Sequence, residues 1–409
     1  MGRWAGLLIL PFALVVEGRR RREILPVTPL NGAIALLLTM VGVSLWATFD
    51  LSFSLGKVAG LLLGLWAFFV VIRFCSTPSR WAMSAVILSL AGCLLAVLAL
   101  LGTSWSDKVS GLRSVTSRLP VLIRGVPGQE EGFQPNAVAG VLALVLPLQG
   151  VLILSKSCRG MLSDQAKVSR GVRKLLMHAV LGGSFALTAG TFLLTQSRGA
   201  WLGLGAAGLL WLAWSGRRGR LVATAGLLLA LAVSLAVGPA KIGRELFQHA
   251  GTGLQGDVAG RLELWSRALY GIEDFPFTGM GMNTFRKVMP VLYPTFLTDP
   301  STDVAHAHNQ LLQVALDLGL PGLVGYLALW IGSLGAAASC IRNRESEAVS
   351  VLGSALACGL TAHFLFGIGD AVALGAKAGI FFWLTLGVLV ALLKVVKSRD
   401  VSTLAQDSE

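Results

Sequence analysis

The sequence predicts an all-α fold, a polytopic transmembrane helical bundle of about 11 spans (10–12) with a long outer loop. The chain has 409 residues, of which 54% are hydrophobic and 13% are charged, with a mean hydropathy of +0.72. Soluble domains carry about twice that share of charged residues. Apolar runs of about twenty residues recur along the chain, and a helix of that length crosses the hydrocarbon core of a bilayer.

The basic residues also follow a pattern that membrane proteins share. The net charge is +13, but the lysines and arginines cluster in short loops between apolar runs. Such clusters mark the cytoplasmic loops of a membrane protein. Topology therefore explains the positive charge, and we expect the membrane and no nucleic acid as a partner.

Residues 1–238 are predicted to form transmembrane helices 1 to 8, joined by short loops. The apolar runs of this region are 4–16, 30–49, 56–72, 81–102, 137–154, 176–195, 200–215 and 221–238. The first of them is short for a span, so it is either a helix whose end the following arginines place in the cytoplasm or a re-entrant segment. Loop 155–175 carries six basic residues against the single acid Asp164, which is the strongest cytoplasmic signal in the chain. Residues 103–135 form a modest polar loop that we expect outside.

The rest of the chain is predicted to complete a single membrane domain. Residues 239–308 form a long extracytoplasmic loop, in which Leu262, Trp265, Leu269 and Tyr270 are spaced for an amphipathic helix along the membrane face. Residues 309–409 hold transmembrane helices 9 to 11 and a short cytoplasmic tail. Their apolar runs are 309–340, 348–368 and 378–393.

The end of the long loop carries the first candidate for chemistry. His308 and Asn309 fall in the first turn of a predicted helix, whose run is interrupted by Gly319, Pro321 and Gly322. The positive end of a helix dipole disfavours a charged imidazole. A neutral imidazole can accept a proton, so His308 is a candidate general base.

Two arginines on the predicted outer side are candidates for binding an anion. Arg198 lies between two apolar runs, where it is either an interfacial anchor beside Trp201 or a ligand for an anionic group. Guanidinium binds phosphate oxygens bidentately, so a phosphate-containing headgroup is a reasonable partner. Arg261 lies one helical turn before Trp265, and a solvated charge is the usual meaning of such an arginine.

The His306-x-His308 spacing raises the question of a metal site. Asp303 and His249 could supply further ligands, but no HExxH or CxxC spacing accompanies them. We therefore expect no metal and no cofactor. The sequence also has no Walker A loop and no GxSxG elbow, which argues against an ATP-driven transporter and a serine hydrolase.

The stretch HAHNQLLQVALDLGLPGLVGY resembles the signature of the O-antigen ligase and O-antigen polymerase superfamily of bacterial envelope proteins. Its residues here are His308, Asn309, Gly319 and Gly322. The resemblance extends to TQSRGAWLG, to GRLELW with the Gly-Met-Gly-Met segment after it, and to QPNAVAG. The resemblance is good over about residues 130–340.

The resemblance implies a metal-independent glycosyltransferase in the bacterial plasma (inner) membrane, with its site facing the periplasm or outside. The donor would be an undecaprenyl-diphosphate-linked glycan, and the acceptor a hydroxyl of a lipid or glycan. His308 matches the essential histidine of the family, and Arg198 and Arg261 match its diphosphate-binding arginines. We also consider a set of possible substrate-binding residues: Asn309, His306, Trp265 and Arg267.

Three functions remain open at this stage. A ligase, which moves a finished glycan onto an acceptor, is slightly favoured by the His-Asn motif and the single long outer loop. A polymerase of the same superfamily would lengthen the lipid-linked chain, and loop 103–135 is modest for its second large loop. A small-solute transporter, such as a bicarbonate transporter, would need paired broken helices in two halves, whereas the break at Gly319 to Gly322 is single.

Overall fold

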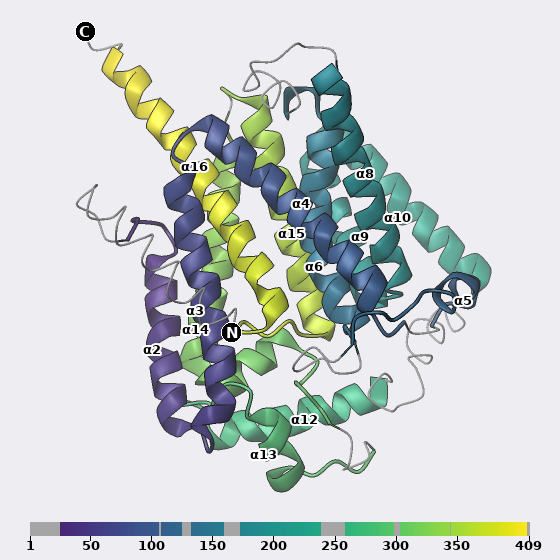
Figure 1. Cartoon of the computed structure of the whole chain (residues 1–409), viewed down its shortest axis with the longest axis vertical. Coiled ribbons are helices and arrows are strands. Elements are labelled where there is room, and N and C mark those ends of the chain that lie inside the picture. The colour runs from purple at the N-terminus through teal and green to yellow at the C-terminus, as the bar shows by residue number, and fades with distance from the viewer. Residues whose placement is uncertain are drawn as a thin grey trace.

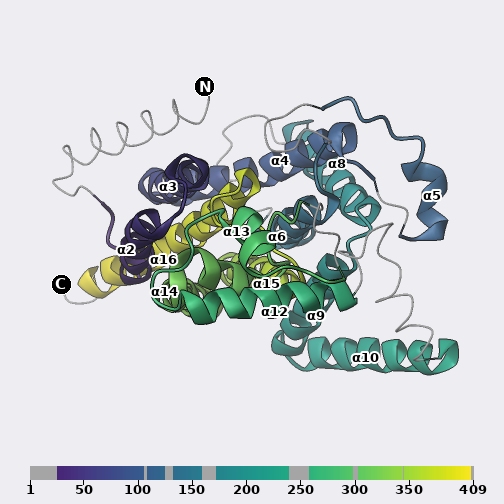
Figure 2. The same cartoon turned by 90° about the horizontal axis from the view of Figure 1, so that it is seen from below.

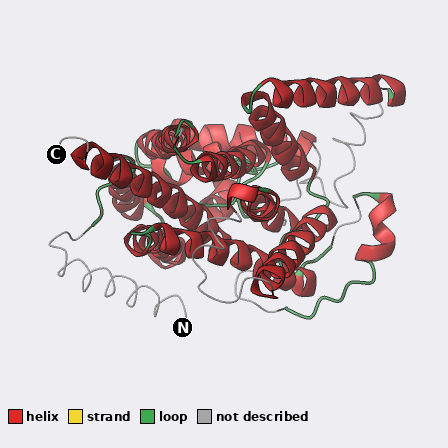
Figure 3. Ribbon diagram, turned by 90° about the horizontal axis from the view of Figure 1, so that it is seen from above, coloured by secondary structure: helices red, strands yellow, loops and turns green. Residues whose placement is uncertain are grey.

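The computed structural model describes residues 25–105, 108–124, 132–158, 172–238, 258–297, 303–343 and 345–406. Over these residues the regular secondary structure is helical, and the single β-bridge joins Thr103 and Phe133 (Figure 3). The predicted apolar run 4–16 and His249 lie outside the described residues.

Eight helices in the described part are long and apolar enough to cross a membrane. They are α3 (Leu51–Phe74), α4 (Pro78–Gly102), α6 (Pro135–Leu154), α8 (Val172–Leu194), α10 (Arg217–Val237), α14 (Gln310–Ile341), α15 (Glu347–Gly369) and α16 (Ile380–Gln406). Two further helices of 17 residues each, α2 (Asn31–Ala47) and α9 (Arg198–Trp214), coincide with predicted apolar runs. The predicted fold class, an all-α polytopic membrane bundle, is confirmed.

Helix α15 lies at the centre of the bundle. It packs against α6, α9 and α14, while α16 packs against α3 and α2 packs against α14. Fully buried Trp81, Phe68, Trp383 and Phe366 fill the space between these helices. Helix α10 lies at the edge of the bundle against α9, and most of its apolar surface is exposed, as a helix facing lipid requires (Figure 2).

One end of the bundle is covered by short helices, and we call it the capped end (Figure 1). The cap consists of α12 (Val258–Asp274) and α13 (Phe285–Leu292) with their connecting segments. On α12, Leu264 and Ala268 are buried against the rest of the cap, whereas Leu262 and Leu269 are about half exposed. The helix is therefore amphipathic, and three of the residues predicted to face the membrane, Leu262, Leu269 and Tyr270, are exposed, whereas Trp265 is partly buried and faces the histidine segment. Two smaller elements complete the structure: α5 (Ser110–Thr116) and η2 (Lys377–Gly379).

A backbone break divides α14 into a short first segment and a long second one. Gly319 has φ 71° and ψ 176°, so the helix is interrupted where the sequence places its Gly-x-Pro-Gly pattern. The cap segment 276–283 fills the break, because Met280 N–H donates to Leu316 O (2.7 Å) and Leu320 N–H donates to Pro276 O (2.7 Å). These bonds supply partners for backbone groups that the break would leave unpaired.

We expect Gly319→Ala to destabilise the protein. A β-carbon at Gly319 would lie 2.6 Å from Phe277 O, and the backbone conformation of Gly319 (φ 71°, ψ 176°) is one that essentially only glycine adopts, at a cost of about 1–3 kcal/mol for other residues. Gly335→Ala, at an exposed position on the second segment of α14, is the matched control, because no heavy atom lies within 4 Å of its added β-carbon. Thermal unfolding in detergent measures the effect. Equal unfolding midpoints for both variants would contradict the strained backbone at Gly319.

Candidate functional site

The start of α14 is fixed by Asn309. Its side-chain Oδ1 accepts hydrogen bonds from Leu311 N–H (2.9 Å) and Leu312 N–H (3.1 Å), while its Nδ2 donates to Ile368 O (3.0 Å) at the end of α15. Asn309 is thus the N-cap residue, which satisfies donors that a helix start leaves unpaired. His308 therefore lies just before the helix rather than in its first turn, in a left-handed conformation with φ 48°.

His308 forms a pair with Asp370, which follows α15. The His308 Nδ1 and Asp370 Oδ1 atoms are 3.2 Å apart. An ionised carboxylate can only accept a hydrogen bond, so Nδ1 carries the proton and donates it to Asp370. The other ring nitrogen, Nε2, is then left with a lone pair that can accept a proton.

His306 lies against the same two groups. Its ring centroid is 4.4 Å from that of His308, and its Nε2 is 3.9 Å from Asp370 Oδ1. Its Nδ1 accepts a hydrogen bond from the backbone N–H of His308 (3.2 Å), so the ring proton lies on Nε2. Burial and the charge of His308 hold the pKa of His306 well below its usual value, so His306 is neutral at physiological pH.

Asp370 is held by hydrogen bonds from three directions. Besides His308, Ala371 N–H donates to its Oδ1 (2.8 Å) and Asn136 Nδ2 donates to its Oδ2 (2.7 Å). Burial alone would raise the pKa of Asp370, but the charge and hydrogen bond of His308, with the charge of Arg261, keep it below its usual value. Asp370 is thus an anion that can orient His308 and stabilise its protonated form.

Two residues of α12 attach the cap to this pair. The Arg261 guanidinium donates to Gly369 O (2.7 Å), directly before Asp370, and Trp265 Nε1 donates to His308 O (3.3 Å). The Arg261 Nε is buried and has no hydrogen-bond partner among the described residues. Arg261 thus brings a positive charge next to Asp370 while part of its hydrogen-bonding capacity is unused.

Arg198 and Lys108 extend the positive charge on the other side. Arg198 begins α9, and its guanidinium donates to Lys108 O (3.3 Å). Gln196, in the same turn, accepts a hydrogen bond from Val109 N–H (2.6 Å). These bonds join the turn before α9 to the segment after α4.

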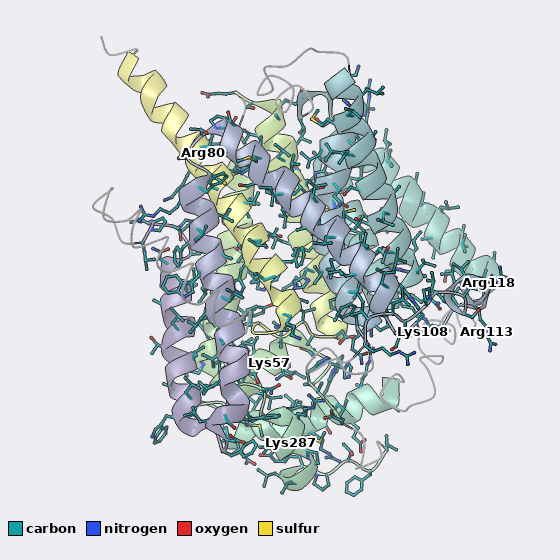
Figure 4. All side chains as sticks on the ribbon, in the orientation of Figure 1. Lys57, Arg80, Lys108, Arg113, Arg118 and Lys287 are labelled. Carbon is teal, nitrogen blue, oxygen red and sulfur yellow. The ribbon has the colours of Figure 1, made fainter. Side chains whose placement is uncertain are left out.

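Lys108, Arg198 and Arg261 are close enough for their charges to interact, so they lie in one site. Lys108 Nζ lies 3.5 Å from Asn136 Oδ1 and feels the charges of Asp370, Arg261 and Arg198. Burial lowers its pKa from the ordinary lysine value; Asp370 opposes this shift, and the two arginines add to it. Figure 4 shows Lys108 and Lys57 toward the capped end, with Arg80 near the other end. The capped end therefore presents a histidine with a free nitrogen beside several cations.

Other predicted residues have contacts within the cap. Arg267 lies near Glu263 (3.9 Å) and packs over the rings of Tyr270 and Phe296. Asp303, considered above as a metal ligand, forms an ion pair with Arg286. The carboxylate beside the two histidines is Asp370 instead.

His306, His308 and Asp370 are also arranged such that they could hold a metal ion, because their ligand atoms all lie within 4.8 Å of one another. Two properties of the site argue against a divalent cation. Asp370 is already engaged by three donors, and the charges of Arg261 and Lys57 act on His306. A divalent cation would be repelled by those charges and would compete with the hydrogen bonds. The arrangement fits a hydrogen-bonded imidazole and carboxylate better than a metal centre.

The structure brings together most of the predicted residues: His308, His306, Asn309, Arg198, Arg261 and Trp265. Sequence reasoning missed three that join them, namely Asp370, Asn136 and Lys108. The signal for Asp370 was an acid at the end of an apolar run, since ionisable groups near a membrane core usually have a partner. Asn136 lies in the QPNAVAG stretch that belongs to the resemblance, but nothing in that stretch pairs it with Asp370, and Lys108 lies in an ordinary polar context that carries no comparable signal.

One comparison with known families bears on this site. Residues 183–327 match the model of a family described as O-Antigen ligase. The matched segment contains Arg198, Arg261 and His308, and it ends before Asp370. No curated protein matched the chain. The family match confirms the resemblance to the O-antigen ligase-like superfamily that the sequence motifs indicate.

We expect the purified protein to carry no stoichiometric divalent metal, because the cations around the two histidines disfavour one. Elemental analysis of the protein after dialysis measures the metal content. His306→Ala serves as the control, since it removes one of the three possible ligands. One equivalent of metal that disappears in this variant would contradict the expectation.

Proposed function

From the O-antigen ligase-like segment at residues 183–327, we propose that the protein transfers a glycan from undecaprenyl diphosphate to an acceptor hydroxyl. The observation that carries the proposal is the His308–Asp370 pair beside the Arg198, Arg261 and Lys108 cations. A proton acceptor next to an anion-binding group is what glycosyl transfer from a diphosphate needs. The donor itself is what the superfamily resemblance implies.

His308 acts as the general base in this proposal. Its Nδ1 is occupied by Asp370 at 3.2 Å, so Nε2 accepts the proton of the acceptor hydroxyl. As that proton arrives, the ring becomes a cation, and the neighbouring carboxylate stabilises the charge without taking the proton. Asp370 is thus a positioning residue that also supports the transition state electrostatically.

The cations stabilise the leaving group. When the bond between the anomeric carbon and the diphosphate breaks, its electron pair goes to the diphosphate oxygen, whose negative charge rises. Arg198, Arg261 and Lys108 are placed around the same region and can bind the phosphate oxygens. The acceptor oxygen forms the new bond from the opposite face, so the configuration of the anomeric carbon inverts.

Within this proposal the residues near the histidine contact the substrates. His306, Asn309 and Trp265 lie around His308, whereas Arg267 lies farther along α12 among cap residues. The proposal takes the capped end as the periplasmic side of a bacterial plasma membrane, as the positive-inside pattern predicts. No metal and no cofactor take part.

The family description favours ligation, and polymerisation by the same site is the alternative. The two reactions differ in the acceptor, which is a separate lipid or glycan for a ligase and a second lipid-linked glycan for a polymerase. The two reactions can be distinguished by mixing purified protein with lipid-linked glycan and membrane extract, without nucleotide, and measuring the size of the products. A single shift of glycan onto a new acceptor indicates a ligase, and a ladder of longer lipid-linked chains indicates a polymerase.

We expect His308→Ala to reduce transfer on the order of 10²- to 10⁴-fold, because the acceptor hydroxyl loses its base. Arg261→Ala and Arg198→Ala each lose on the order of 10²- to 10³-fold, because the leaving diphosphate loses a charge-stabilising donor. Initial rates in proteoliposomes, at saturating donor, measure the effects.

Arg286→Ala is the matched control for the arginine variants, since Arg286 belongs to the same cap but pairs with exposed Asp303. It should retain transfer within a few-fold of the native rate. If His308→Ala and Arg261→Ala both kept the native rate, the proposed function would be wrong.

We expect Lys108 to make the Michaelis constant for the donor depend on pH in the alkaline range. Because burial lowers its pKa, Lys108 loses its charge at a lower pH than a free lysine does, and the Michaelis constant for the donor should rise as that happens. Lys108→Arg keeps a cation throughout this range, so its Michaelis constant should stay flat. Donor titrations from about pH 7 to 10 test this. An equal rise in both proteins would mean that another group titrates.

A further inference from the structure

A chain of hydrogen bonds runs from the inside of α14 to the peptide between the two histidines. The backbone N–H of Ala307 donates to Gln313 Oε1 (2.9 Å), and Gln313 Nε2 donates to Asp317 Oδ1 (2.9 Å). All three residues are buried, with Gln313 3% and Asp317 6% exposed. Asp317 Oδ1 also accepts from Asn283 N–H (3.2 Å), so this oxygen is an acceptor and fixes which end of the Gln313 amide faces Ala307.

The backbone that this chain holds is strained. His308 adopts φ 48°, and the left-handed region costs a residue with a side chain about 1–2 kcal/mol. Such a conformation persists where the surroundings over-determine it. Trp265 anchors the carbonyl of His308, and Gln313 anchors the N–H one residue earlier. Without the second anchor, the segment from His306 to His308 is free to relax toward an unstrained conformation.

Asp317 is in turn held by the cap. Asn283 N–H donates to the same Oδ1 atom (3.2 Å), and Asn283 Nδ2 donates to Phe53 O (3.3 Å) on α3. The cap segment approaches closely here, since a β-carbon at Gly279 would lie 2.7 Å from Leu318 N. The Asp317 carboxylate therefore links the cap segment 276–283 to the histidine segment through Gln313.

We propose that Gln313 and Asp317 are positioning residues for His308. The Gln313 amide, oriented by the Asp317 carboxylate, holds the peptide N–H between the two histidines, and this keeps His308 Nδ1 on Asp370. The inference rests on the proposed function, because it assigns a role in the reaction through His308. It extends that function to two residues that lie inside α14 and that the substrates do not need to touch.

The positions of the bonds suggest an experiment in which the amide of Gln313 and the carboxyl group of Asp317 are exchanged. Gln313→Glu can still accept from Ala307 N–H, but it lacks the amide hydrogen that Gln313 donates to Asp317 Oδ1, so the native bond between the two side chains is lost. Asp317→Asn keeps an oxygen that can accept from Gln313 and Asn283, since both bonds go to Oδ1. In the double variant Gln313→Glu with Asp317→Asn, the new carboxamide can donate to the new carboxylate, which restores the bond between positions 313 and 317 but leaves Asn283 N–H without its acceptor.

We expect the turnover number of Gln313→Glu to fall about 10- to 100-fold, as for a small misplacement of a reacting group. Its Michaelis constant for the donor should stay within a few-fold of the native value, because Arg198, Arg261 and Lys108 lie on other elements. Asp317→Asn should stay near the native rate. The double variant should recover part of the loss seen in Gln313→Glu, because the bond between positions 313 and 317 re-forms while the bond to Asn283 does not.

Gln310→Met is the matched control. Gln310 lies one turn before Gln313 on α14 and is 4% exposed, and its side-chain amide has no hydrogen-bond partner within the described part of the chain. Replacing such a group by an apolar one is close to neutral, so the turnover number should not change. For each variant, the turnover number and the Michaelis constant are measured in proteoliposomes. The thermal unfolding midpoint of each variant is measured alongside.

The outcomes separate this inference from the proposed function. If the native protein shows no His308-dependent transfer, the proposed function fails and the inference fails with it. If the native protein is active and depends on His308, but Gln313→Glu keeps the native turnover number, the inference alone is overturned. It is equally overturned if Gln313→Glu loses activity and the double variant recovers none of it while the unfolding midpoints match.

Discussion

The arrangement of the capped end depends on the hydrogen bonds that the buried carboxylate of Asp370 accepts. Asp370 follows α15 and accepts hydrogen bonds from Asn136 at the start of α6 and from His308 just before α14. Hydrogen bonds to a charged group contribute about 1.5–3 kcal/mol each, and a buried charge without them is costly. The ends of three central helices are therefore brought together by one anion, and the cations of Arg261 and Lys108 lie around it.

The cap fixes the positions of these helix ends relative to one another. Arg261 and Trp265 bind α12 to the ends of α15 and α14, and segment 276–283 fills the break at Gly319. The break lets the first segment of α14 be set by the cap, while the second segment packs within the bundle. Trp265 of the cap holds the His308 carbonyl, Gln313 of α14 holds the preceding peptide N–H, and Asp370 holds the ring, so His308 has little freedom to turn, which is the property a general base needs.

The fold was largely predictable from the sequence because it follows from composition. All ten predicted apolar runs that lie within the described residues coincide with helices, since runs of about twenty apolar residues have few other stable structures in a bilayer. The break at Gly319 was also predicted, because glycine and proline act locally. The exact start of α14 was not, since the capping by Asn309 moves His308 out of the first turn.

The candidate site was predictable in part. His308, Arg198 and Arg261 follow from the motifs and their predicted side of the membrane, but their mutual contacts depend on long-range packing. Asp370 lies 62 residues after His308 and Asn136 lies 234 residues before Asp370, so no local pattern pairs them. The position of Arg267 within the cap likewise follows from contacts with Phe296 rather than from its place in α12.

The most direct test of the account is a cryo-electron microscopy structure in a lipid nanodisc with an unreactive analogue of the lipid-diphosphate glycan. The account predicts that the diphosphate oxygens lie within hydrogen-bonding distance of Arg198 and Arg261, with the anomeric carbon open to an acceptor beside His308 Nε2. A diphosphate bound away from these arginines, or a His308 whose Nδ1 has left Asp370 in the complex, would contradict it.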